Sequence, residues 1–102
     1  MTEQRKHHRV PLHLAVTCIP PEGEGFEGSV KDISLGGMFV EAERQLPFAS
    51  SLTLVLTGVA GRELRLPAVV RWSDPHGFGV QFGLVGAYAT HAILELVKKS
   101  TT

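Results

Sequence analysis

The sequence predicts an all-β domain, a small six-stranded antiparallel β-barrel with one C-terminal α-helix. Two observations favour this fold. Segments in which apolar and polar residues alternate follow one another through most of the chain, separated by turns rich in glycine and proline. Near the C-terminus the apolar residues instead recur every three or four positions, which is typical of an amphipathic helix. The 102 residues, 43% of them hydrophobic, are enough for one domain spanning residues 1–102.

The first three strands are expected at residues 12–18, 26–34 and 38–42. In the first of them every second residue is apolar, which indicates a half-buried strand. A loop of proline, glycine and glutamate separates the first strand from the second. The second and third strands are expected to form a hairpin, because Leu35-Gly36-Gly37 predicts a tight turn in which glycine takes a positive φ freely.

Alternating apolar residues also predict the strands in the second half of the barrel. Leucines alternate in a fourth strand around residues 52–56, and a sixth strand is expected at residues 78–82. The fifth strand contains Pro67, which indicates an edge position or a bulge. Its inner face is expected to comprise Leu64, Leu66, Ala68, Val70 and Trp72. The barrel is therefore expected over residues 10–83 and the helix over residues 86–98.

Composition argues against several classes of function. Ten Lys and Arg balance ten Asp and Glu, which argues against broad binding of nucleic-acid polymers. A single cysteine, Cys18, rules out an internal disulfide, and the five histidines lack the spacing of metal ligands, so no metal site is expected. No apolar stretch approaches the ~20 residues of a membrane span. With no visible signal peptide, a cytoplasmic protein without direct membrane insertion is expected.

Two short motifs resemble catalytic or nucleotide-binding sequences but lack the required context. Residues 23–28 read G-x-G-x-x-G, yet a β-type sequence follows where a helix is needed, and the glutamates of this loop would repel phosphates. Ser34 resembles a nucleophile elbow, but its first glycine is missing and no helix follows. The chain is therefore expected to have no catalytic residues and no cofactor, and not to be an enzyme.

An N-terminal arm, residues 1–9, carries an R-x-x-x-R pattern formed by Arg5 and Arg9. The planar guanidinium group of arginine donates two parallel hydrogen bonds to phosphate oxygens or to guanine O6 and N7, and its face stacks on bases. The arm immediately precedes the first strand, where it can fold over the barrel. Because basic segments are commonly no more than solvated charge, that alternative stays open for this motif taken alone.

A second pattern, D-x-S-x-x-G, is formed by Asp32, Ser34 and Gly37. Strand alternation places Asp32 and Ser34 on one face. A carboxylate can accept two N–H bonds from the N1/N2 edge of guanine, and a serine hydroxyl can donate to a phosphate or fix the turn. Gly37 permits a tight bend and close approach of the backbone. A hairpin whose polar residues only cap the turn is the alternative.

Together the two motifs resemble the PilZ domain family, whose members bind the bacterial second messenger cyclic di-GMP. The sequences Val69-Val70-Arg71-Trp72 and Gly77-Phe78-Gly79-Val80-Gln81-Phe82 are similar to the last two strands of that family, and the resemblance covers roughly residues 4–98. It implies a six-stranded barrel with a C-terminal helix. The ligand-binding residues that it implies are Arg5, Arg9, Asp32, Ser34 and Gly37, with Gln4, Lys6 and Gly36 as additional candidates.

The resemblance implies a cyclic di-GMP receptor that acts as an adaptor. The ligand would order the arm against the barrel and so change the surface offered to an unidentified effector protein. The expected processes are motility, type IV pili, biofilm or virulence control, for a monomer or a homodimer. One alternative is a PilZ-like protein-interaction adaptor that does not bind nucleotide. A barrel for single-stranded nucleic acid is disfavoured because the aromatic residues are expected mostly in the core, and a flavin enzyme is a more distant alternative.

Overall fold

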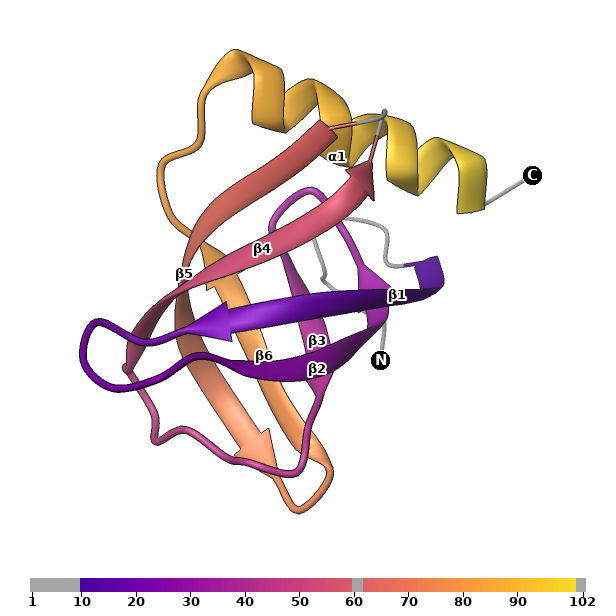
Figure 1. Cartoon of the computed structure of the whole chain (residues 1–102). Helices are drawn as coiled ribbons and strands as arrows, with labels where there is room; N and C mark the ends of the chain where they lie inside the picture. The colour runs from indigo at the N-terminus through magenta and orange to yellow at the C-terminus, as the bar shows by residue number, and fades with distance from the viewer. Residues whose placement is uncertain (1–9, 60–61, 101–102) are drawn as a thin grey trace, which may run out of the picture.

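The computed structural model describes residues 10–59 and 62–100, and these form six strands and one helix. The elements are β1 (Val10–Ile19), β2 (Phe26–Ile33), β3 (Gly37–Glu41), β4 (Ser51–Val59), β5 (Arg62–Asp74), β6 (Gly77–Phe82) and α1 (Ala87–Ser100). The strands close into an antiparallel barrel in the order β1-β2-β3-β6-β5-β4 (Figure 1). The expected fold class, an all-β barrel with a C-terminal helix, is confirmed.

Apolar side chains from all the strands fill the interior of the barrel. Met38, Leu54, Leu66 and Phe78 are fully buried, and each is an inward residue of an alternating strand. Burying one such side chain stabilises the folded state by roughly 1.5–3 kcal/mol. The alternation that identifies the strands in the sequence is therefore also what forms the core.

The helix α1 lies across one end of the barrel (Figure 1), where it contacts β1 and β5. Ala89, Ala92 and Ile93 are its buried residues, at the spacing expected for an amphipathic helix. The guanidinium carbon of Arg62, at the start of β5, lies 5.0 Å from the centre of the Tyr88 ring, so a cation–π contact also joins the helix to the barrel. The helix continues to Ser100, two residues beyond its expected end.

The described strands contain four register shifts, and two of them are β-bulges that redirect side chains near the second motif. Relative to β6, the register of β5 shifts between Val70 and Trp72, and relative to β3 the register of β2 shifts between Val30 and Asp32. Each extra residue reverses the alternation that follows it. The prediction that Trp72 belongs to the inner face is therefore wrong, and its side chain is 52% exposed.

The expectation that the aromatic residues lie mostly in the core is also only partly met. Phe78 and Phe82 are buried, whereas Phe48, Trp72 and Tyr88 are exposed. The barrel therefore presents aromatic rings to solvent, which an argument from strand parity alone does not reveal.

Pro67 does not occupy an edge strand, because the barrel is closed. The register shifts of β5 fall opposite residues 56–59 and at residues 70–72, both away from Pro67. The carbonyl of Pro67 accepts a hydrogen bond from the N–H of Gly83 (2.8 Å), just beyond the end of β6. In an antiparallel strand the N–H and C=O of one residue face the same neighbour, so the missing N–H of Pro67 faces Gly83 beyond the end of β6, and the β4–β5 ladder loses no hydrogen bond.

Cys18 lies fully buried on β1. Burial, with a smaller contribution from the negative charge of Glu27, raises the pKa of its thiol from 9.0 to about 12. The neutral thiol is thus favoured in the folded state. The stabilisation that this provides is complete below pH 9 and is lost as the pH rises toward about 12.

We expect native Cys18 to react with a disulfide reagent at pH 8 at least about 100-fold more slowly than in the urea-unfolded chain, because both burial and the raised pKa suppress the thiolate. The absorbance of the released thiol chromophore measures this rate. A native rate close to that of the unfolded chain would contradict the buried position.

Candidate functional site

The D-x-S-x-x-G motif lies at the turn that joins β2 to β3, and the first residues of β1 lie beside it. Val10 pairs with Ile33, and Pro11 pairs with Asp32. Arg9 is bonded directly to Val10, so the arginine motif is attached to the barrel next to the aspartate of the second motif. The predicted site residues Gln4, Arg5, Lys6 and Arg9 themselves lie outside the described residues.

Ser34 fixes the turn between the two strands. Its backbone N–H donates to the carbonyl of Gly37 (2.8 Å), its hydroxyl oxygen accepts from the N–H of Gly36 (3.2 Å), and its O–H makes a longer contact with the Gly37 carbonyl (3.4 Å). Ser34 is only 2% exposed. Because β2 ends at Ile33, strand alternation does not extend to Ser34, and the expected common face with Asp32 is not found. The turn-fixing role is the one that this geometry supports.

Gly37 is required by the close approach of β6. A Cβ atom at this position would overlap the carbonyl oxygen of Val80, and the neighbouring Gly36 carbonyl accepts a hydrogen bond from the N–H of Phe82 (2.9 Å). The expected positive φ is not found in this turn, since the described glycines with positive φ are Gly23 and Gly58. The constraint on Gly37 is therefore one of space, not of backbone dihedral angle.

Asp32 points to the outside of the barrel because of the β2 bulge. Four residues on neighbouring strands form one cross-strand row, in the order Asp32 (β2), Phe39 (β3), Gly79 (β6) and Trp72 (β5). The rings of Phe39 and Trp72 stack, with centroids 5.0 Å apart and an angle of 19° between their planes. The indole lies directly over Gly79, where a Cβ atom would come within 2.7 Å of the ring carbon Cε2. One row across four strands thus combines a carboxylate with an exposed aromatic surface.

Arg71, the residue before Trp72, adds a described cation to this part of the surface. Its Nε donates to Oε1 of Gln81 (2.9 Å), and Gln81 is the cross-strand partner of Gly37. Among the residues that the structure describes, no three His, Cys, Asp or Glu side chains are grouped so that they could hold a metal ion. The described side chains of this surface offer hydrogen bonding, charge and stacking.

Comparison with known families identifies the chain. A model of the PilZ domain matches residues 3–98, which include both motifs. The chain belongs to the PilZ domain family. PilZ domains are a family of cyclic di-GMP-binding domains that act as binding and adaptor modules. The resemblance of this chain to the PilZ family is thereby confirmed.

Solved PilZ structures share the fold. The PilZ domain of CeSA from a cellulose-synthesizing bacterium is 20% identical, with a TM-score of 0.74 over 93% of this chain and 99% of that one. The PilZ domain of YcgR from Escherichia coli, solved with c-di-GMP, is 11% identical, with a TM-score of 0.80 over 97% of this chain and 92% of that one. The Bacillus subtilis inhibitor of motility, MotI/DgrA, is 22% identical, with a TM-score of 0.79 over 98% of this chain and 52% of that one.

A curated relative is the cellulose synthase 2 of Novacetimonas hansenii, 29% identical over 100 residues. This match covers 94% of the present chain but only 6% of the synthase. The chain therefore resembles one small part of that enzyme. In the described part of the present PilZ domain, no helix has the length and hydropathy needed to cross a membrane.

Strict alternation along the strands does not predict the outward-facing pair of Phe39 and Trp72 in this PilZ domain. A signal for it exists in the sequence, because Gly79 lies between buried Phe78 and Val80 in a strand that neighbours Trp72. A glycine within a strand often marks a place where another group approaches closely. Here that group is the indole, which explains why the bulge and the glycine occur on adjacent strands.

Gly37→Ala is expected to destabilise the barrel by about 1–3 kcal/mol, because the added methyl group would displace the β6 backbone at Val80. Urea unfolding followed by circular dichroism measures the change. Gly83→Ala is the matched control, since the nearest atom to a Cβ there lies 3.6 Å away, an ordinary van der Waals distance. It should change the free energy of unfolding by less than about 0.5 kcal/mol. Equal effects of the two substitutions would contradict the steric role of Gly37.

Proposed function

We propose that this PilZ domain binds cyclic di-GMP on the outer face around Asp32 and the 34–37 turn, with Arg5 and Arg9 of the N-terminal arm completing the site. The observation that carries the proposal is the pairing of Pro11 with Asp32. It attaches the R-x-x-x-R motif to the barrel beside the D-x-S-x-x-G motif. Two motifs that are well separated in the sequence can therefore act on one ligand.

The residue types suit a dianionic guanine dinucleotide. The guanidinium groups of Arg5 and Arg9 would pair with the phosphates or with guanine O6 and N7, and the carboxylate of Asp32 would accept from guanine N1 and N2. An aspartate has no such use in a pure phosphate site, whereas it has one in a guanine site. Ser34, Gly36 and Gly37 would hold the turn in place beneath the ligand. Gln4 and Lys6 are additional candidates for contacts from the arm.

The Phe39/Trp72 stack lies in the same outward row as Asp32, so it offers an aromatic surface next to the guanine-reading carboxylate. Stacking of a base on an aromatic side chain is worth about 1–3 kcal/mol. Arg71 contributes positive charge beside the turn. We therefore include Trp72 and Arg71 in the region that the bound nucleotide approaches.

The second part of the proposal is an adaptor role without catalysis. Ordering of the arm over the barrel would change the surface presented to a partner protein, which carries the signal onward. The relatives include an inhibitor of motility and a cellulose synthase, which supports control of motility or biofilm formation as the process. Because the ligand is an intracellular second messenger, a cytoplasmic location is part of the proposal, for a monomer or a homodimer.

Cyclic di-GMP titrated into the protein in a calorimeter should give saturable binding, which Arg5→Ala/Arg9→Ala should weaken roughly 100-fold or more. Each lost hydrogen bond between charged groups costs about 1.5–3 kcal/mol. Asp32→Ala should also weaken binding, roughly 10-fold, because a guanine N–H edge would lose its acceptor.

The control is Arg65→Ala, which removes an exposed arginine that pairs with Glu63 on β5. Its affinity should be unchanged, and GTP should bind the wild-type protein far more weakly than cyclic di-GMP. If no heat is observed and a second binding method agrees, the adaptor that does not bind nucleotide becomes the better description.

Trp72 is the only tryptophan of the chain, so its fluorescence reports on this face alone. We expect its emission intensity to change on saturation with cyclic di-GMP, because a guanine near the stack alters the surroundings of the indole. Trp72→Ala should weaken binding about 5- to 100-fold by calorimetry. Calorimetric binding with unaltered emission and an unaltered affinity of the variant would remove Trp72 from the site.

A further inference from the structure

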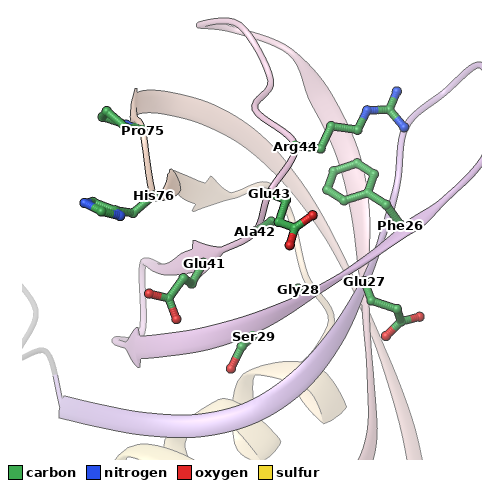
Figure 2. A pocket seen from close by; sticks show the side chains of 10 residues that line it. All are labelled: Phe26, Glu27, Gly28, Ser29, Glu41, Ala42, Glu43, Arg44, Pro75 and His76. Carbon is green, nitrogen blue, oxygen red and sulfur yellow. The ribbon is translucent and has the colours of Figure 1, made fainter.

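A groove with a volume of about 680 Å³ opens at the end of the β2–β3 hairpin that is remote from the 34–37 turn (Figure 2). Its walls are the start of β2, the segment that follows β3, and the turn between β5 and β6. Figure 2 shows Phe26 and Arg44 on one side, Pro75 and His76 on the other, and Glu43 between them. None of these residues takes part in the proposed nucleotide site.

The groove exists because β3 does not pair with the first three residues of β2. β2 pairs with β1 as far as Phe26, but with β3 only from Ser29. After Glu41 the chain turns toward the β5–β6 turn, where the N–H of Ala42 donates to the carbonyl of His76 (3.0 Å). Phe26 and Glu27 therefore have a strand on one side and the groove on the other, whereas Gly28 still lies against residues 40–42. This is the geometry in which an extended peptide can lie beside a strand.

The groove combines an apolar wall with carboxylates. Phe26 is held in place by edge-to-face contact with buried Phe78 (centroids 6.3 Å apart) and by the guanidinium of Arg44, 4.8 Å from its ring centre. Glu27, Glu41 and Glu43 also line the groove. These three carboxylates exceed the single guanidinium among the lining residues, so the groove is acidic.

Two of the carboxylates have solvent-exposed partners in the free protein. Nζ of Lys31 lies 3.9 Å from Glu41 Oε2, with about half of each side chain exposed (43% and 48%). Glu27 accepts a hydrogen bond from the hydroxyl of exposed Thr17 (2.9 Å). An exposed ion pair of this length contributes little to stability, so a cation of a partner could replace Lys31 at low cost.

We propose that this groove docks an extended, positively charged segment of the partner protein, in which Lys or Arg alternates with apolar residues. Alternation would place the apolar side chains toward Phe26 and Ala42 and the cations toward the glutamates, since successive residues of a strand point to opposite sides. The net charge of the whole chain is zero, so the acidity of this face steers a basic partner here specifically. The inference rests on the adaptor part of the proposed function and assigns a surface and a chemistry to the unidentified partner.

The test uses a fluorescein-labelled hexapeptide in which Lys or Arg alternates with Val, and a second peptide in which Gln replaces each cation. Fluorescence anisotropy, measured without nucleotide, should show saturable binding of the basic peptide that weakens with added salt. Glu41→Gln/Glu43→Gln should weaken this binding about 5- to 10-fold. Glu63→Gln/Glu95→Gln changes the net charge equally on β5 and α1 and should leave the affinity within about twofold.

Amide chemical shifts in ¹H–¹⁵N spectra locate the peptide independently, and the largest changes should fall at residues 26–29 and 41–44. The proposal is overturned by equal binding of the Gln peptide, by equal losses in the two double variants, by shifts confined to other residues, or by no binding up to about 1 mM. Because the nucleotide is absent, this result is separate from the calorimetry with cyclic di-GMP. Either experiment can fail while the other succeeds.

Discussion

Two of the four register shifts in this barrel determine that Asp32 and Trp72 face outward. One lies on β2 before Asp32 and the other on β5 before Trp72, so they flank the paired strands β3 and β6 on both sides. Without them, strand alternation would point both side chains into the core, where the carboxylate would be costly. With them, both side chains lie outward in one row, and Gly79 leaves the space that lets the indole reach Phe39. Bulges commonly redirect side chains in this way beside functional sites.

The alternating strands, the hairpin and the C-terminal helix could all be predicted from the sequence, because each is a local pattern of apolar spacing. The bulges could not, since an inserted residue has no signature until the partner strand is known. The β5 bulge is why the expectation of an inward Trp72 fails, whereas the expected common face of Asp32 and Ser34 fails because β2 ends at Ile33. Pro67 was assigned to an edge or a bulge for a related reason, because the point at which β6 ends is a property of the neighbouring strand. The glycine motif was recognised, but close packing against Val80, not a positive φ, explains it.

The two ends of the β2–β3 hairpin carry the two surfaces discussed above. Its turn carries the residues of the second motif, and its open end forms one side of the acidic groove. Between them lies Lys31, which neighbours Asp32 in the bulge and also approaches Glu41 at the groove. A ligand near Asp32 and a peptide at Glu41 would therefore act on charges that are adjacent along one strand. If both proposals hold, the nucleotide site and the peptide groove would lie at opposite ends of one hairpin of a single small domain.

The described barrel supplies only part of what a dianionic nucleotide requires. Near the turn it offers a carboxylate, an aromatic stack and Arg71, whose guanidinium also bonds Gln81. Phosphates need more positive charge than this, and the sequence places that charge in the arm, bonded to the strand that pairs with Asp32. If the arm supplies most of the cations, as proposed, the affinity would depend on the cost of holding it against the barrel. Ligand binding would then be thermodynamically coupled to the position of the arm. A signalling adaptor needs such coupling.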